Sequence, residues 1–166
     1  TGKSLGENLE AWSDPFGIDR RVIRTKEDPF GRSGGLAVLR GNLAPGTGIT
    51  KPIAMDPSMY FFSGPARVFE CEEDANEAIL AGKIKEGDVL VIRYEGPKGG
   101  PGMREMYFAM KLLYGRGLAK KTAIITDGRF SGTNNGCFVG HISPEAAEGG
   151  PIAAVRDGDI ITIDIK

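Results

Sequence analysis

A glycine-rich loop between Glu95 and Glu105 is the first segment whose composition could support chemistry. It reads Glu-Gly-Pro-Lys-Gly-Gly-Pro-Gly-Met-Arg-Glu, follows an apolar run typical of a strand, and leads into a run with helical spacing. Backbone N–H groups and a positive helix end would then lie together, an arrangement that suits a phosphate or a carboxylate. The loop lacks the spacing of a Walker A or dinucleotide-binding motif. An anion site and a tight strand-to-helix connection are therefore equally open interpretations.

A second motif, Thr126-Asp-Gly-Arg-Phe-Ser-Gly-Thr133, places Ser131 after an apolar, β-branched run and just before a glycine. It is similar to a nucleophile elbow, but its spacing differs from Gly-x-Ser-x-Gly. His141 is the only histidine and hence the only candidate base for a Ser–His pair. A serine hydrolase is thus a minor alternative. A plain turn whose hydroxyl groups bond to the backbone is the ordinary structural interpretation.

The remaining candidate ligands do not form a metal motif. A single histidine is a poor metal site, and Cys71 and Cys137 lie too far apart in the sequence for a zinc or iron–sulfur motif. We therefore expect His141 to be structural and both thiols to be buried. Ser143-Pro144 predicts a helix start capped by Ser143, with Glu145 and Glu148 on its solvated face.

Composition limits the classes of partner. The chain has 166 residues, about one domain, and 21 basic residues balance 22 acidic ones, so no net charge attracts nucleic acid or an anionic membrane. No apolar run approaches the ~20 residues of a spanning helix. Two cysteines cannot form a disulfide framework and are compatible with a cytoplasmic location. The 25 glycines are about twice the usual share, which indicates many tight turns.

Local patterns predict an irregular lead-in over residues 1–33 and one folded domain over residues 34–166. Helices are expected at 72–82, where acidic residues open the first turn, and at 103–114. Strands are expected at 36–39, 49–53, 66–69, 89–92, 122–126, 138–140, 152–155 and 160–163. Pro52 would confine the second of these strands to a sheet edge, and Asp157-Gly158 would form a hairpin between the last two.

These elements predict a fold class. Seven or eight short strands and two or three helices, without strict β-α-β alternation, indicate a β-rich α/β domain. A barrel or sandwich with a few covering helices fits this pattern better than a doubly wound sheet does.

Longer motifs resemble a known family. The runs Arg93–Met106, Thr126–Gly132 and Gly140–Pro151 closely resemble the dihydroxy-acid dehydratase family, which also includes phosphogluconate and sugar-acid dehydratases. Thr1–Leu9 and Gly41–Pro45 look like the interdomain segment and the start of the C-terminal domain of the same family. The resemblance therefore covers essentially the whole chain, and the lack of an initiator methionine fits a piece of a longer protein.

The resemblance implies a C-terminal domain with a swivelling β/β/α barrel. The N-terminal domain of the same enzyme would supply the cysteines of an iron–sulfur cluster (2Fe-2S or 4Fe-4S) and most ligands of a magnesium ion. Residue by residue, Glu105 matches the carboxylate that this domain contributes to magnesium. Ser131 matches the base that removes the proton at carbon 2 of the substrate, and Thr133 matches a position near the substrate carboxylate.

The implied activity is that of a hydro-lyase that removes water from a 2,3-dihydroxy acid to give a 2-oxo acid in branched-chain amino acid biosynthesis. The enzyme would be a cytoplasmic homodimer, and the isolated chain would be inactive. Gly41-Asn-Leu-Ala-Pro45 favours this branch, whereas Met55–Ser63 and Asn134-Asn135 depart from it and leave a sugar-acid or phosphogluconate dehydratase as an alternative. A non-catalytic binding or regulatory barrel is the alternative from a different class.

Overall fold

The computed structural model describes residues 2–11, 17–31, 34–131 and 135–165. The chain divides into two units, Thr1–Gly34 and Gly35–Lys166. The first unit contains the short helix α1 (Leu5–Glu10), which begins with a capping box between Ser4 and Glu7. Every helix in the described ranges is too short or too polar to cross a lipid bilayer.

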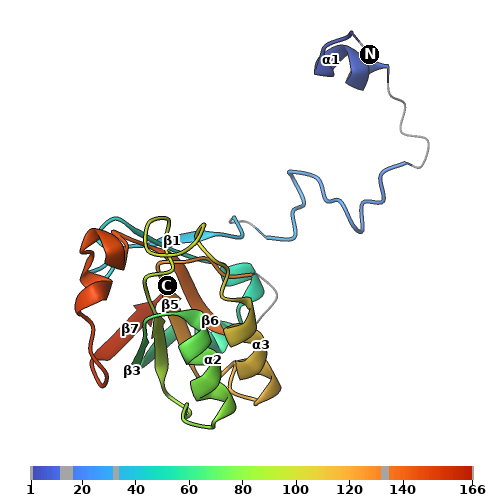
Figure 1. Cartoon of the computed structure of the whole chain (residues 1–166). Helices are drawn as coiled ribbons and strands as arrows, with labels where there is room; N and C mark the ends of the chain where they lie inside the picture. The colour runs from blue at the N-terminus through green and yellow to red at the C-terminus, as the bar shows by residue number, and fades with distance from the viewer. Residues whose placement is uncertain (1, 12–16, 32–33, 132–134, 166) are drawn as a thin grey trace. The chain divides into compact units, whose positions relative to one another are not determined.

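The second unit is built on one seven-stranded sheet (Figure 1). Its strands are β1 (Ala37–Leu39), β2 (Thr47–Thr50), β3 (Phe61–Phe69), β4 (Val89–Ile92), β5 (Ala123–Thr126), β6 (Cys137–Ser143) and β7 (Ile160–Asp164). They lie in the order β1-β2-β6-β5-β4-β3-β7. The four central strands are parallel, and the outer pairings β1–β2, β2–β6 and β3–β7 are antiparallel. The predicted β-rich α/β class is confirmed.

Two helices connect the parallel strands. Helix α2 (Glu72–Leu80) joins β3 to β4, and α3 (Tyr107–Gly115) joins β4 to β5. Both pack on the same face of the sheet, where they also contact each other. These two β-α-β units were not predicted, because four-residue strands separated by glycine-rich loops hide the alternation.

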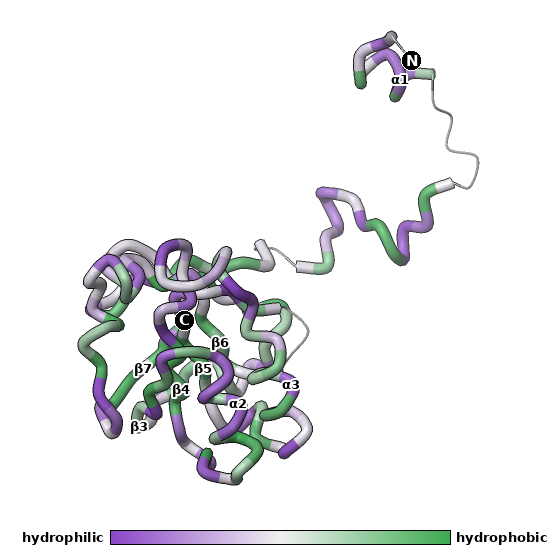
Figure 2. Tube along the Cα trace, in the orientation of Figure 1, coloured by the Kyte–Doolittle hydropathy of each residue, from purple (hydrophilic) through white to green (hydrophobic). Residues whose placement is uncertain are grey.

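Side chains alternate between two hydrophobic clusters along the central strands. Val89 and Val91 face one side of the sheet, whereas Leu90 and Ile92 face the helices. Figure 2 shows hydrophobic residues along β4 and β5 and hydrophilic residues on α2. Burial on both faces explains why these strands read as continuous apolar runs.

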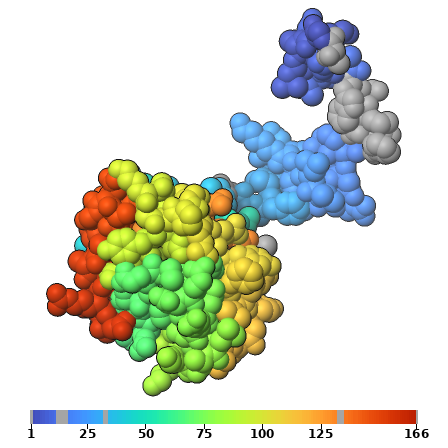
Figure 3. Space-filling view, in the orientation of Figure 1, coloured from blue at the N-terminus to red at the C-terminus, as the bar shows by residue number. Residues whose placement is uncertain are grey.

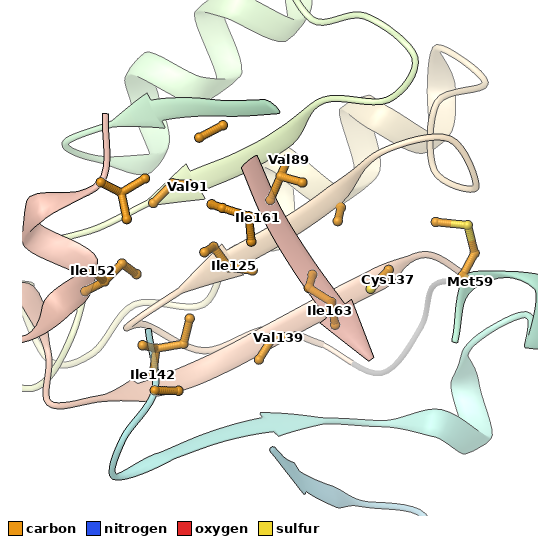
Figure 4. Close-up of a cluster of buried hydrophobic side chains, with 14 of the residues drawn as sticks. Met59, Val89, Val91, Ile125, Cys137, Val139, Ile142, Ile152, Ile161 and Ile163 are labelled. Atoms are coloured by element: carbon orange, nitrogen blue, oxygen red, sulfur yellow. The ribbon is translucent and has the colours of Figure 1, made fainter. Parts of the chain in front are cut away.

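The cluster on the face away from α2 and α3, here called the inner core, is closed by the sheet itself. Ile161 and Ile163 of β7 pack over residues of β4, β5 and β6 (Figure 4). Met59 in the 3₁₀ helix η2 (Pro57–Met59) and Ile152 in η4 (Pro151–Ala154) cover its ends. A groove of about 390 Å³, lined mainly by β7 and by the loop after β1, opens onto this core.

Three sequence-based predictions near the C-terminus were wrong. Residues 152–155 form η4 instead of a strand, because Pro151 opens a helical turn and cannot donate to a sheet ladder. Asp157-Gly158 therefore forms no hairpin, although Gly158 has a positive φ of 89° and donates its N–H to Ala66. Ser143 ends β6 and does not cap a helix; the turn η3 (Ala146–Glu148) begins after Glu145.

Two other predictions need correction. The strand predicted to be an edge is the inner strand β2, which pairs with β1 and β6, and Pro52 belongs to the 3₁₀ helix η1 (Pro52–Ala54) after it. The helix expected from residue 103 begins only at Tyr107. Met103 has a φ of 56°, and Glu105 lies in an isolated parallel bridge with Arg129.

We predict that Gly64→Ala strongly destabilises the domain. A methyl group at Gly64 in β3 would overlap the carbonyl oxygen of Gly87, which is backbone and cannot move away easily. We expect a loss of at least about 2 kcal/mol in the free energy of unfolding, measured by urea denaturation. Gly115→Ala is the matched control, because nothing lies within 4 Å of a Cβ there and its φ is not positive. Equal stabilities of the two variants would contradict the described β3–β4 packing.

Candidate functional site

The two sequence motifs lie side by side at one edge of the parallel sheet. Strands β4 and β5 pair in register, with Ile92 opposite Thr126 at their carboxyl ends. The glycine-rich loop follows β4 and the Ser131 turn follows β5, so both leave the sheet at the same edge. Figure 3 shows the loop (yellow-green to yellow) on the surface beside α2 (green). In α/β sheets, ligands bind outside the carboxyl ends of parallel strands.

Asp127 fixes the connections at this edge. Its side chain is 1% exposed, and its two carboxylate oxygens accept hydrogen bonds from three backbone N–H groups. The donors are Tyr94 (3.1 Å) and Glu95 (2.9 Å) at the start of the glycine-rich loop, and Ala146 (2.8 Å) after β6. One buried carboxylate thus ties the loops after β4 and β6 to the end of β5.

A backbone bridge brings Glu105 toward Ser131. Arg129 donates its N–H to Arg104 (2.9 Å) and accepts the N–H of Met106 (2.7 Å), so Glu105 lies opposite Arg129. Ser131 follows two residues later, at most about 7 Å along the chain. The fold therefore places these two predicted site residues in one region, although they are far apart in sequence.

The side chain of Arg104 anchors the segment that carries Glu105. It forms two hydrogen bonds with Glu73 (2.5 and 2.9 Å) and lies 3.7 and 3.6 Å from the buried carboxylates of Glu72 and Glu95. These contacts raise the pKa of Arg104 through the Glu73 hydrogen bonds, so the guanidinium stays charged. This cluster could not be predicted from the sequence, because four charged residues spread over three segments form no motif.

Glu72 also binds the backbone at the start of α3. Its carboxylate accepts the N–H of Ala109 (3.1 Å) in the first turn of α3, which lacks a side-chain cap of its own. Burial raises the pKa of Glu72, whereas these hydrogen bonds and Arg104 favour the charged form. The helix that follows the glycine-rich loop is therefore fixed by a residue of α2.

The glycine-rich loop binds a carboxylate of its own chain. Glu145 accepts hydrogen bonds from the N–H groups of Lys98 (2.9 Å) and Gly99 (2.9 Å). Its side chain is buried, so the expectation of a solvated Glu145 was wrong. Glu148 forms an ion pair with the Lys98 ammonium group. The sequence left two interpretations of this loop open, an anion site and a tight strand-to-helix connection. Because these N–H groups already bind Glu145, the second interpretation applies to them.

Backbone strain concentrates at the same place. Tyr94, Met103 and His141 are the non-glycine residues with positive φ (62°, 56° and 54°) in the described chain. Each is hydrogen-bonded to the segment 127–129. Tyr94 N–H donates to Asp127, Met103 C=O accepts from Arg129 Nε (2.8 Å), and His141 N–H donates to the Gly128 carbonyl (2.8 Å). Strained residues held in this way are typical of functional sites.

Glu105 differs from the other acidic residues around it. Glu72, Glu95, Asp127 and Glu145 are buried and accept hydrogen bonds from the chain itself. Glu105 is exposed, and its carboxylate makes no hydrogen bond or ion pair within the described ranges. It is therefore free to bind a ligand.

Two further predicted residues lie nearby in sequence. Ser131 is half-buried, at the end of a described segment, and Thr133 falls outside the described residues. The described residues contain no group of three or more His, Cys, Asp or Glu side chains arranged to hold a metal. The groove beside β7 is lined by neither Glu105 nor Ser131, so it is distinct from this site.

The structure lends the serine hydrolase alternative little support. The His141 backbone reaches the Ser131 turn, but within the described ranges no carboxylate hydrogen-bonds to its side chain, as a triad would require. Burial lowers the pKa of His141, and the nearby charges of Arg129 and Lys51 lower it further. The imidazole is therefore largely neutral at pH 7.

The two cysteines do not form a cluster site. Cys137 is fully buried in the inner core, and burial raises the pKa of its thiol to about 12. Cys71 is half-buried at the start of α2, so the prediction that both thiols are buried is confirmed for Cys137 and wrong for Cys71. Iron–sulfur clusters need several thiolates that converge, and the described residues offer no such set.

We predict that Asp127→Asn destabilises the folded protein by about 2–4 kcal/mol. The amide group would put an N–H donor where N–H donors already converge, so at least one buried backbone group would lose its acceptor. Urea denaturation measures the loss. Asp74→Asn, at an exposed position in α2, is the control and should cost less than about 1 kcal/mol. Similar losses for both would mean that Asp127 does not hold the loops.

A second prediction concerns the thiols. At pH 8 a thiol with a pKa of about 12 has only about one thiolate in 10⁴ molecules, so Cys137 should not react with a disulfide reagent in the folded protein. Reaction should appear once urea unfolds the chain. Cys71→Ser isolates the signal of Cys137. Rapid modification of Cys137 in that folded variant would contradict the described burial.

Comparison with known proteins identifies the family of this chain. Residues 21–166 match the family described as dihydroxy-acid/6-phosphogluconate dehydratase C-terminal. Three similar proteins are the dihydroxy-acid dehydratases of Methanosarcina barkeri (55% identical), Agathobacter rectalis (57%) and Desulfosudis oleivorans (58%), each matched over 99% of this chain. The chain spans only 29–30% of their length. A match over most of the chain, at this level of identity, shows that it belongs to the dihydroxy-acid/6-phosphogluconate dehydratase family, as a C-terminal domain.

Proposed function

We propose that this chain is the catalytic C-terminal domain of a dehydratase that converts a 2,3-dihydroxy acid into a 2-oxo acid. One observation carries the proposal. The bridge between Glu105 and Arg129 brings an exposed carboxylate without an internal partner in the described chain close to a serine. The other acids at this sheet edge accept hydrogen bonds from the chain itself. A binding domain without catalysis would not need an unpaired carboxylate next to a serine there.

The similar proteins support the dihydroxy-acid branch over the sugar-acid branch, since those compared above are named dihydroxy-acid dehydratases. The unusual segment Met55–Ser63 does not weigh against this branch. Met55 and Met59 are buried in the inner core, and Asp56 forms an ion pair with Lys120 (2.7 Å). Its composition therefore reflects packing more than substrate choice.

Glu105 fits as one ligand of a magnesium ion. Mg²⁺ prefers carboxylate oxygen and commonly takes only one or two protein carboxylates, with water and substrate oxygens completing the octahedron. Glu105 is exposed and has no internal partner among the described residues. Bound magnesium would supply positive charge that acidifies the C–H bond beside the substrate carboxylate. Further ligands would come from the larger part of the enzyme.

Ser131 would remove the proton from carbon 2. A neutral serine is a very weak base at pH 7, so the site must stabilise its alkoxide with nearby positive charge. The proton moves from carbon 2 to the serine oxygen while the 3-hydroxyl group leaves. That proton then passes to the departing hydroxyl group, which leaves as water and restores the serine alkoxide. The resulting enol tautomerises to the 2-oxo acid: its 2-hydroxyl group loses a proton and carbon 3 gains one.

The residues of this chain do not fit an iron–sulfur cluster. The thiol of Cys137 is enclosed by the inner core, and Cys71 lies apart from it at the start of α2. We therefore assign any cluster to the part of the enzyme that this chain does not cover.

The test uses the full-length enzyme, purified without oxygen, with 2,3-dihydroxyisovalerate and a panel of aldonic acids as substrates. Ser131→Ala should lower kcat at least about 10³-fold because no other group here would take the proton. Glu105→Gln should lower activity and raise the magnesium concentration needed for half-maximal rate. Ser58→Ala, an exposed hydroxyl in η2, is the control.

The outcomes separate the alternatives. Turnover of the dihydroxy acid that is lost in Ser131→Ala supports the proposal, and turnover only of an aldonic acid assigns the sugar-acid branch. Wild-type rates in Ser131→Ala would eliminate the serine as base and raise the binding-domain alternative.

A further inference from the structure

Ser131 lies in a short connection between two parallel strands. Strands β5 and β6 pair in parallel, so the chain must return from the carboxyl end of β5 to the amino end of β6 within ten residues, 127–136. Parallel strands usually need a connection of about a dozen residues or more. A connection of this length has little slack. Holding both of its ends therefore restricts where Ser131 can lie between them.

The two ends of this connection are bound by different elements. Near its start, the bridge with Glu105 holds Arg129, two residues before the serine. At its end, the carbonyl oxygen of Asn135 accepts the backbone N–H of Asp56 (3.1 Å), the residue that precedes η2. The segment between β2 and β3 thus holds the chain just before it enters β6.

The donor Asp56 belongs to a segment that is anchored in the core. Met55 before it and Met59 after it are both buried in the inner core. Met59 lies at the end of this core toward Cys137, the first residue of β6 (Figure 4). Asp56 therefore cannot move away from the connection without disturbing this packing.

An ion pair joins the two elements that flank the end of the connection. Oδ2 of Asp56 is 2.7 Å from Nζ of Lys120, in the turn after α3. A Cβ at Gly136 would overlap the carbonyl oxygen of Ala119, so the chain passes directly against that turn. Asn135 thus contacts the η2 side, Gly136 contacts the α3 side, and the ion pair joins both. These two charged residues are here called the Asp56–Lys120 clamp.

Both members of the clamp are charged around neutral pH. The hydrogen bond from Lys120, and then those from Ser58, lower the pKa of Asp56. Oδ1 of Asp56 accepts the N–H (3.0 Å) and the hydroxyl group (2.8 Å) of Ser58. Loss of the Ser58 hydroxyl group alone would leave the ion pair and the bond from the Ser58 N–H in place.

A neighbouring ion pair offers a close comparison. Lys121 pairs with Glu86 at 2.8 Å, and its side chain is about as exposed as that of Lys120 (50% and 51%). Glu86 lies in the turn before β4, so this second pair holds no residue of the connection between β5 and β6. The two lysines therefore differ mainly in what their partners hold.

We propose that the Asp56–Lys120 clamp positions Ser131 for proton transfer by fixing the end of the connection that carries it. The inference rests on the proposed function, because it takes Ser131 as the base. Asp56 and Lys120 touch no substrate in this proposal, so they are positioning residues. A base must be held within about 0.5 Å of its productive position. Loosening the clamp should therefore slow removal of the C2 proton and leave substrate binding nearly unchanged.

The experiment uses variants of the full-length enzyme, purified without oxygen. Asp56→Ala removes the ion pair and keeps the backbone N–H, whereas Asp56→Pro removes both. Proline fits this position, because Asp56 has a φ of −65° and Met55 is extended (φ −101°, ψ 141°). Lys120→Met removes the pair from the other side, and Lys120→Arg keeps it. Lys121→Met is the matched control, and thermal unfolding shows which variants fold.

Three quantities are measured with 2,3-dihydroxyisovalerate: kcat, KM, and the isotope effect on kcat of deuterium at carbon 2. We expect Asp56→Ala and Lys120→Met to lower kcat about threefold to fivefold, the upper part of the range for an exposed ion pair. Asp56→Pro should lower kcat at least about tenfold, because a backbone hydrogen bond is lost as well.

The other two quantities separate positioning from binding. KM should stay within about twofold of the wild-type value, since no contact with the substrate is lost. The isotope effect should be at least as large as in the wild type, because proton transfer is the step that slows. Lys121→Met and Lys120→Arg should match the wild type in all three quantities.

Wild-type kcat in Asp56→Ala and Lys120→Met would overturn the clamp even if Asp56→Pro is slow, because the ion pair would then hold nothing. An equal loss of kcat in Lys121→Met, or a loss with a smaller isotope effect, would overturn it too, since either indicates a general structural effect. If Asp56→Pro does not fold, Asp56→Ala and Lys120→Met decide. If Ser131→Ala abolishes turnover while the clamp variants keep wild-type values, only the positioning role is wrong and the proposed function stands.

Discussion

The site depends on one buried carboxylate. Asp127 stands at the end of β5 and accepts N–H groups from Tyr94, Glu95 and Ala146. Four-residue parallel strands cannot by themselves orient the loops that follow them, since each loop has many conformations of similar energy. The Asp127 carboxylate restricts both loops, because it accepts hydrogen bonds from each of them. The positions of Glu105 and Ser131 follow, because the segment after Asp127 carries both the bridge to Glu105 and the serine.

The same principle extends to the other buried acids. Glu72 receives an N–H group of α3, Glu95 receives one of α2 (Glu72 N–H, 2.9 Å), and Glu145 receives two from the glycine-rich loop. Each joins segments that are distant in sequence. Buried charges are costly unless they are hydrogen-bonded, so these acids are stable only in the folded arrangement. Substituting one of them would leave buried backbone N–H groups without an acceptor.

Sequence patterns predicted the parts of this structure that depend on local physics. The acidic first turn of α2, the β-branched run of β5 and the turn glycine Gly82 all act within a few residues, and the structure confirms them. The resemblance to a family indicated Glu105 and Ser131 as site residues. Their proximity through the bridge to Arg129 could not be predicted, because an isolated bridge has no periodic pattern.

The errors have a common cause. Glu145 looks like a solvated helix residue, and residues 152–155 look like a strand, as long as only their neighbours in sequence are considered. Tertiary contacts reversed both: the N–H groups of a distant loop made burial of Glu145 favourable, and Pro151 began a helical turn that buries Ile152. Local propensity decides only where no long-range polar contact competes with it.

The distribution of charge at the sheet edge separates structure from chemistry. Acids that face inward are satisfied by N–H groups of the chain, whereas Glu105 keeps its charge available at the surface in the described domain. A charged group that is fully paired inside a domain cannot gain much from a ligand, since binding would have to break existing contacts. An exposed carboxylate without an internal partner among the described residues can instead bind a cation. That separation fits the proposed function, in which Glu105 binds a metal ion together with ligands from the rest of the enzyme.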